Sequence, residues 1–183
     1  IEPVYPLEFF EIPTDSLFRH QWYLHNTGQE YYGVQRNDGA ENDSIVLKTG
    51  IAGKDINQLP FYNNPPNEAT KVVVGIVDTG VDIDHPELVG HIWRNPDEIA
   101  DNGIDDDHNG FIDDIVGYDV SGDRLTFFDP VGDNEPTDSV GHGTHIAGIV
   151  AASRNGRGVV GVAPQVEIMA VKIRPNATTA VGA

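Results

Sequence analysis

A histidine between two glycines, at the start of an apolar helix, is one of two features of this sequence that could do chemistry. His142 lies in GHGTHIAG, residues 141–148, and the small, apolar residues that follow predict a helix able to pack closely on a sheet. The positive end of a helix dipole disfavours added positive charge, which helps to keep the ring neutral, as a general base must be. His142 is therefore a candidate base, although this histidine taken alone fits a structural role better.

The other feature is an aspartate directly after an apolar run. Residues 71–88 read KVVVGIVDTGVDIDHPEL, in which the β-branched run 72–77 predicts a buried parallel strand that ends at Asp78. The carboxyl ends of strands are where α/β proteins place their chemistry, but Asp and Gly are also common there as turn residues. Taken alone, Asp78 is either a site carboxylate or part of a turn.

The elements that would position these two residues form one supersecondary unit. A second apolar run, VEIMAVKI at residues 166–173, follows the helix and predicts another buried strand. Strand, helix and strand at this spacing predict a βαβ unit with a right-handed crossover in a parallel sheet. Residues 1–70 show weak periodicity, with polar loops predicted at 36–44 and 61–70.

Composition excludes several classes of function. The 183 residues contain 11 Lys and Arg against 29 Asp and Glu, a net charge of −18, which argues against nucleic acid and anionic membranes as partners. The absence of cysteine excludes disulfides, thiolate zinc sites and a cysteine nucleophile. No apolar run approaches the roughly 18 residues that a membrane span needs.

His142 and His145 together form a His-x-x-His pair, which leaves a zinc site as an alternative. The zinc-protease helix motif instead needs histidines four residues apart with an adjacent Glu. We therefore expect His145 to be a packed, hydrogen-bonded structural residue.

Acidic residues cluster in DNGIDDDHNGFIDD, residues 101–114, in a spacing that matches a calcium loop. Gly110 stands at the sharp bend, and Val116 occupies the position of the closing Glu of an EF-hand, so the loop is not a complete EF-hand. The alternative is a solvated acidic loop. The candidate ligands are Asp105, Asp107, Asn109, the carbonyl of Phe111, and Asp113.

Three segments, VVVGIVDTGVDIDHPEL, GHGTHIAGIVAA and GVAPQVEIMAVKI, occur in this order, and through them the chain resembles the subtilisin-like serine proteases, the subtilases. The resemblance implies that Asp78 is the triad aspartate and His142 the general base. It also implies an α/β fold, a parallel sheet with helices on both faces, of which this chain holds the N-terminal half.

The resemblance extends upstream and suggests domain boundaries. TDSLFRHQWYLHNTGQ is similar to the start of the family's catalytic domain, and IEPVY to the last strand of its propeptide. We therefore expect residues 1–14 to be the end of a propeptide or a linker. Residues 15–183 would be the N-terminal part of a peptidase domain, with the acidic calcium-loop insertion at about 95–120.

The triad serine is missing from the pattern. None of the serines stands in the Gly-Thr-Ser-Met-Ala turn that the family uses; they are Ser16, Ser44, Ser121, Ser139 and Ser153. The resemblance implies a secreted, calcium-stabilised serine endopeptidase that acts on polypeptides. Its serine would come from the rest of the protease, as continuous chain or as a nicked second chain, and this chain alone is expected to be inactive. The alternatives are a non-catalytic calcium-binding fragment or pseudoprotease and, more distantly, a zinc peptidase.

The resemblance also implies that calcium binds at the acidic loop and at a second site. Glu87 stands at the second site where the family has aspartate, and a metal there would tie the N-terminal segment to the domain. The implied ligands of this second site are Asp15, Glu87, the side chain of Asn155, and carbonyls near Ser153, Arg157 and Val159.

Overall fold

The chain divides into two compact units, and Asp78 and His142 both belong to the second. The first unit comprises Ile1–Glu68 and Arg154–Val159; the second comprises Ala69–Ser153 and Val160–Ala183. The computed structural model describes residues 11–35, 44–63, 71–121 and 132–173. None of the helices in these ranges is long and apolar enough to cross a membrane.

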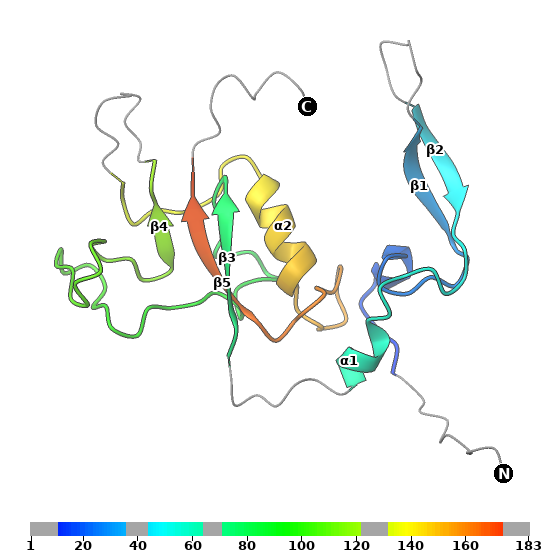
Figure 1. Ribbon diagram of the computed structural model, residues 1–183, viewed down its shortest axis with the longest axis horizontal. Coiled ribbons are helices and arrows are strands. Elements are labelled where there is room, and N and C mark those ends of the chain that lie inside the picture. The colour runs from blue at the N-terminus through cyan, green and yellow to red at the C-terminus, as the bar shows by residue number, and fades with distance from the viewer. Residues whose placement is uncertain (1–10, 36–43, 64–70, 122–131, 174–183) are drawn as a thin grey trace. The chain divides into compact units, whose positions relative to one another are not determined.

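A three-stranded parallel sheet forms the centre of the second unit (Figure 1). Across the sheet its strands are β3 (Val73–Asp78), β5 (Glu167–Lys172) and β4 (Gly117–Asp119). β5 pairs in parallel with both neighbours, and Asp78 lies opposite Lys172 in the register. The parallel sheet and the α/β fold class predicted from the sequence are confirmed.

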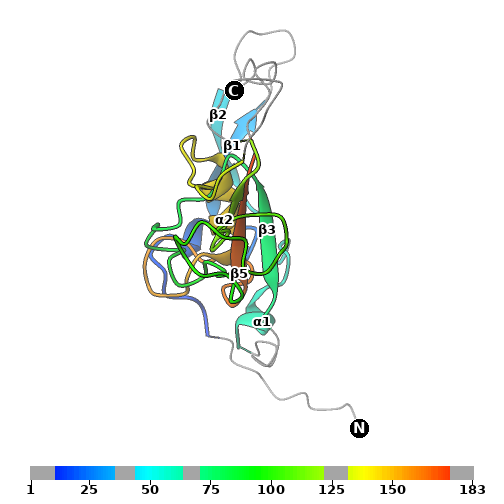
Figure 2. The same cartoon turned by 90° about the vertical axis from the view of Figure 1, so that its left-hand side faces the viewer.

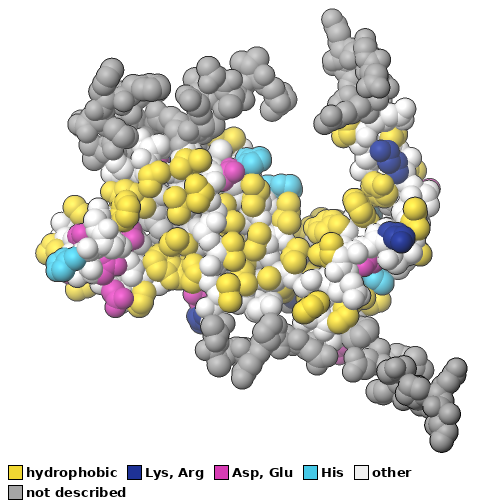
Figure 3. Space-filling view, viewed as in Figure 1, with side chains coloured by type: hydrophobic (Ala, Val, Ile, Leu, Met, Phe, Trp, Pro, Cys, Tyr) yellow, Lys and Arg dark blue, Asp and Glu magenta, His cyan; other side chains and the backbone are white. Residues whose placement is uncertain are grey.

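Helix α2 (His142–Ala151) packs against β3 and β5 on one face of this sheet (Figure 2). Small side chains allow the close approach that the sequence predicts, since Ala147 and Ala151 are fully buried. The opposite face leaves hydrophobic side chains exposed, as Figure 3 shows. The core beneath α2 consists of Ile76, Val81, Leu88, Ala147, Ala151, Val166, Ile168 and Ala170.

Strand β4 is an element that the sequence analysis missed. It is only three residues long, Gly-Tyr-Asp, and has no apolar run to mark it. Gly117 lies opposite Ala170 with a φ of +123°, and a side chain at Gly117 would overlap the Ala170 backbone. Glycine is required here both for the backbone conformation and for the close approach of the strand.

The first unit contains regular elements that the weak periodicity of residues 1–70 did not reveal. Strands β1 (Glu30–Gln35) and β2 (Ser44–Thr49) form an antiparallel pair, accompanied by the 3-10 helix η1 (Phe18–His20) and helix α1 (Leu59–Asn63). The sequence analysis predicted neither β1 nor β2, because much of their apolar surface faces solvent. Tyr32 is 79% exposed, so hydrophobicity does not separate an inner from an outer face.

Some predictions fall on residues that the structure does not describe. The polar loop at 36–44 lies outside the described residues except for Ser44, and so do residues 1–10 of the expected propeptide segment. The loop predicted at 61–70 begins within α1, and its remaining residues are again not described. The boundary at residues 14 and 15 stays a prediction.

Candidate active site

Asp78 is the last residue of β3, so a strand anchored in the core fixes the position of its carboxylate. Ile76, two residues earlier on the same face, is buried under α2. The Asp78 side chain is 19% exposed, and its Oδ1 accepts a hydrogen bond of 2.7 Å from the backbone N–H of Thr79.

His142 is the first residue of α2, and its ring meets the carboxylate of Asp78. The two atoms His142 Nδ1 and Asp78 Oδ1 are 2.7 Å apart. Because an ionised carboxylate can only accept, Nδ1 is the donor, and in a neutral ring this leaves the lone pair on Nε2. The imidazole is 64% exposed, so it is open to a partner beyond Asp78.

The hydrogen bonds at Asp78 keep its carboxylate charged. Burial alone would raise the pKa of Asp78, but the hydrogen bonds from His142 and Thr79 outweigh it, so the pKa lies below its usual value. Asp78 is therefore anionic at neutral pH. In this state it can hold the imidazole in one tautomer and stabilise the imidazolium when it forms.

Two glycines let the strand end and the helix start approach this closely. A side chain at Gly143 would overlap the backbone oxygen of Gly80 and would lie 3.1 Å from Asp78 Cβ. Gly80 itself has a φ of +104°, and a side chain there would overlap the backbone oxygen of Pro136. Any other residue at Gly143 would push α2 away from β3.

Asp138 belongs to this site, and the sequence analysis missed it. Its carboxylate accepts hydrogen bonds from the hydroxyls of Thr79, at 2.9 Å, and Thr144, at 2.7 Å. Thr79 follows Asp78, and Thr144 lies two residues after His142. In the sequence, Asp138 is visible only as an acidic residue four positions before His142. Its role could not be predicted, because it depends on hydrogen bonds with Thr79 and Thr144 that only the structure shows.

His145 differs from its prediction. It was expected to be packed and hydrogen-bonded, but its side chain is exposed on α2. The zinc alternative gains no support from the described residues, where the single candidate metal group is made of carboxylates without either histidine.

The sequence profile of the subtilase family, Peptidase_S8, matches residues 69–182, which include the Asp78–His142 pair. This chain is a subtilase. It is 41% identical over 107 residues to Subtilisin-like protease 1 of Plasmodium berghei (strain Anka), covering 57% of this chain and 16% of that protein. Fervidolysin of Fervidobacterium pennivorans is 36% identical over 107 residues, covering 57% of this chain and 11% of that protein. Thermitase of Thermoactinomyces vulgaris is 33% identical over 110 residues, covering 60% of this chain and 28% of that protein.

Solved structures show the same fold. The serine protease of Aeromonas sobria, crystallised in complex with the chaperone ORF2, superposes with a TM-score of 0.57 at 24% identity. The superposition covers 90% of this chain and 21% of that chain. A second structure of the same protease gives a TM-score of 0.54 at 24% identity, over 88% of this chain and 20% of that one. This subtilase chain therefore spans about a fifth of those proteases.

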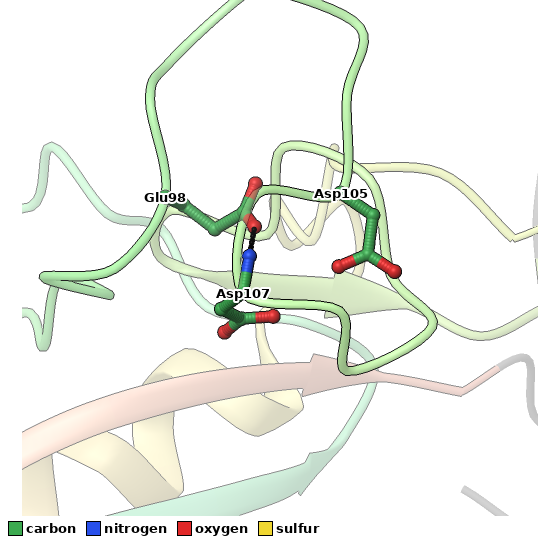
Figure 4. A group of neighbouring side chains, drawn as sticks. All are labelled: Glu98, Asp105 and Asp107. Carbon is green, nitrogen blue, oxygen red and sulfur yellow. Dashed lines mark hydrogen bonds between the residues drawn. The ribbon is translucent and has the colours of Figure 1, made fainter.

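The acidic loop between β3 and β4 brings together two of the predicted calcium ligands with one residue that was not predicted (Figure 4). Carboxylate oxygens of Glu98, Asp105 and Asp107 lie within 4.8 Å of one another. Glu98 was missed because it stands outside the spaced acidic run. Its Oε1 accepts the backbone N–H groups of Asp106 and Asp107, which places it against the loop.

The other predicted ligands of this subtilase loop make different contacts. Asn109 accepts the backbone N–H of Phe111 through Oδ1 and donates through Nδ2 to Asp107. Asp113 accepts the backbone N–H groups of Asn102 and Gly103. Their roles as metal ligands, and that of the Phe111 carbonyl, stay predictions.

At the implied second calcium site, one buried carboxylate oxygen is unpaired. Asp15 is 4% exposed, and its Oδ1 accepts the backbone N–H groups of Asn155 and Gly156, whereas its Oδ2 is buried with no hydrogen-bond partner in the described chain. A buried oxygen of this kind fits a cation better than a closed protein network. Asn155 Oδ1 accepts the N–H of Arg157. Glu87 belongs to the other unit, and the roles of Glu87, Arg157 and Val159 stay predictions.

Proposed function

We propose that this chain is part of a secreted, calcium-stabilised serine endopeptidase, in which Asp78 and His142 are two members of an Asp-His-Ser triad. One observation carries the proposal: the 2.7 Å hydrogen bond between Asp78 Oδ1 and His142 Nδ1, formed by a strand end and a helix start 64 residues apart. The serine would come from residues outside this chain, either in continuous polypeptide or in a nicked second chain. The substrates would be polypeptides.

In the proposed reaction His142 moves one proton twice. Its Nε2 takes the proton of the serine hydroxyl as the serine oxygen attacks the scissile carbonyl carbon. The imidazolium, stabilised by Asp78, then gives this proton to the departing amine, and the C–N bond breaks to leave an acyl-enzyme. Water hydrolyses the ester in the same manner and restores the serine.

Two of the five serines of this chain have hydroxyls that are engaged away from His142, which supports a nucleophile from elsewhere. The Ser153 hydroxyl pairs with His91 at 3.0 Å and donates to the backbone oxygen of Glu87 at 3.1 Å. The Ser121 hydroxyl donates to Asp119 at 2.6 Å. Both hydroxyls are thus bound within the second unit at places other than His142.

A fluorophosphonate probe, which labels an activated serine, tests the triad. The purified protein is treated with the probe and its polypeptides are weighed under denaturing conditions. We expect label on a polypeptide or segment other than this 19.9 kDa chain, loss of labelling in His142→Ala, and full labelling in the control His145→Ala, whose ring is exposed one turn further on. An unlabelled wild-type protein would overturn the proposal and favour a non-catalytic calcium-binding protein.

Calcium is the proposed cofactor at two places. The carboxylates of Glu98, Asp105 and Asp107 support the first, because three negative groups this close repel one another unless a cation lies between them. The buried, unpaired oxygen of Asp15 supports the second. Bound to the folded form alone, calcium would stabilise the fold and hold the acidic loop in one arrangement.

Secretion is proposed from family membership, since many subtilases act outside the cell. Immunodetection of the protein in culture fluid and in washed cells would test it. Protein confined to the cells would contradict an extracellular role.

A further inference from the structure

Asp138 is the acceptor in a hydrogen-bond network that joins the two elements carrying the proposed catalytic pair. Its Oδ1 accepts from the Thr79 hydroxyl and from the backbone N–H groups of Val140 and Gly141. Its Oδ2 accepts from both the hydroxyl and the backbone N–H of Thr144. One carboxylate thus receives five hydrogen bonds, all between 2.7 and 3.0 Å.

The start of α2 depends on this network because it has no side-chain cap of its own. The capping residue is Gly141, in the left-handed conformation at a φ of +99°. The first N–H groups of a helix have no partner within the helix. Here Asp138 accepts those of Gly141 and Thr144, and the Thr79 hydroxyl accepts that of Gly143 at 3.0 Å.

The network includes a sequence neighbour of each member of the proposed catalytic pair. Thr79 directly follows Asp78, and Gly143 directly follows His142. The Thr79 hydroxyl donates to Asp138 and accepts from Gly143, so it connects the end of β3 to the start of α2. The Asp78–His142 hydrogen bond is therefore one of several bonds that fix these two elements against each other.

We infer that Asp138 is a positioning residue, which holds the His142 ring in hydrogen-bonding geometry with Asp78 through Thr79 and the start of α2. Among the described residues, no hydrogen bond joins Asp138 to the His142 ring, so it acts through Thr79 and the start of α2. The consequence for catalysis rests on the proposed function, whereas the geometry at His142 does not. Hydrogen bonds hold the pKa of Asp138 well below its usual value although burial alone would raise it, so the acceptor stays ionised at neutral pH.

A plain helix cap would also lower stability when removed, so the test needs a readout at the pair itself. The variant Asp138→Asn keeps the shape but replaces one of the two acceptor oxygens with an NH2 donor. It therefore loses either the two bonds from Thr144 or the three bonds from Thr79, Val140 and Gly141. The matched control is Asp133→Asn, since Asp133 accepts one backbone N–H, from Glu135, away from the pair.

The first measurement is the proton NMR signal of His142 Nδ1–H in the complete protein, expected far downfield because this N–H donates a short hydrogen bond to a carboxylate. We expect Asp138→Asn to shift or broaden the signal and Asp133→Asn to leave it unchanged. The second is peptide hydrolysis, where a misplacement of this kind lowers kcat by about 10- to 100-fold with KM within about 2-fold, because it affects the reacting groups and not substrate binding.

A second pair of variants keeps the test decisive if Asp138→Asn does not fold. Thr79→Val removes the bridging hydroxyl at nearly constant shape, and Thr79→Ser retains it. The inference requires that Thr79→Val changes the His142 signal and that Thr79→Ser restores it.

The outcomes separate this inference from the proposed function. A normal His142 signal with no labelling by the serine probe would overturn the protease proposal, and the variants would still decide the role of Asp138. A lower melting temperature with an unchanged His142 signal and unchanged kcat in Asp138→Asn would make Asp138 a cap only and would overturn the inference.

Discussion

The β3–α2 junction and the acidic loop both gather carboxylates, but they hold them in different ways. At the junction, Asp78 and His142 come from a strand and a helix 64 residues apart, and glycine, hydroxyl and carboxylate contacts fix them. In the loop, Glu98 and Asp107 are nine residues apart, and backbone N–H groups of the loop itself bind the Glu98 carboxylate.

The difference shows which interactions hold the side chains of each site in place. The junction pairs a negative group with a donor, so its geometry is satisfied by protein atoms alone. The loop places three carboxylates within 4.8 Å without a cationic side chain in that group, and the proposed calcium ion would balance their charge.

The largest effect is expected at the junction, from Asp78→Asn. The amide cannot keep His142 in the tautomer that leaves Nε2 as the acceptor, so kcat should fall by about 10⁴-fold, the scale known for this change in other triad proteases. Peptide hydrolysis at saturating substrate measures it. A loss below about 10-fold would show that the 2.7 Å contact is not catalytic.

A smaller but still large effect is expected from Gly143→Ala. The added methyl would overlap the Gly80 backbone, so α2 must move from β3, with a loss of about 1–3 kcal/mol in the free energy of unfolding and a loss of hydrolysis. Gly148→Ala in the same helix is the control, because nothing lies within 4 Å of the added atom. The control should gain up to about 1 kcal/mol from helix propensity. Equal stabilities in urea unfolding would contradict the close approach.

We expect substitutions in the acidic loop, and not at the junction, to change calcium binding and the stability gained from it. Glu98→Gln or Asp105→Asn is expected to weaken calcium binding by about 10-fold, or about 1.4 kcal/mol, measured by isothermal titration calorimetry. Asp101→Asn is the control, an exposed acid of the same loop outside the group. At calcium about 100 times its Kd, the wild type should gain about 2.7 kcal/mol of stability, lost on chelation. No binding at all would leave the loop as a solvated surface.

The sequence could predict the parts of this molecule that depend on short stretches. The apolar run before Asp78 and the glycines around His142 identify β3 and α2, because buried parallel strands and closely packed helices have a local composition. The structure confirms both elements, and the bounds of β3 differ by one residue at each end from the predicted run 72–77. The subtilase resemblance supplied the pairing of the two residues, which local composition could not.

What the sequence missed depends on contacts between distant segments. β4 exists because Gly117 fits against Ala170, 53 residues later, and not because its own residues favour a strand. The fold of the loop brings Glu98 next to Asp105 and Asp107. Asp138 is linked to the end of β3 by a hydrogen bond from the hydroxyl of Thr79, 59 residues earlier. The exposed apolar residues of β1 and β2 hid a hairpin, since hydrophobicity marks a strand only where one face is buried.

The smallest expected effect is a difference between the junction and the acidic loop in how their stability depends on pH. The pKa values of Asp138 and Asp107 both lie below the usual value. Burial alone would raise the pKa of Asp138, but the hydrogen bonds that its carboxylate accepts outweigh this effect. At Asp107 the largest contribution is the hydrogen bond from Asn95, which lowers the pKa. Each carboxylate thus stabilises the fold above its unfolded pKa of about 3.8, and this stability is lost as the pH falls through the lower folded-state value.

The two carboxylates should differ in how calcium changes this loss. Protonation at the junction breaks protein hydrogen bonds, so the stability difference between wild type and Asp138→Asn should shrink below about pH 4 to the same extent with or without calcium. Protonation of the loop also releases the ion, so the difference for Asp107→Asn should shrink more steeply with calcium present. Urea unfolding across pH 3–6, with and without calcium, measures both. Identical calcium responses of the two variants would mean that the junction and the loop are not independent, and that the contrast between them is wrong.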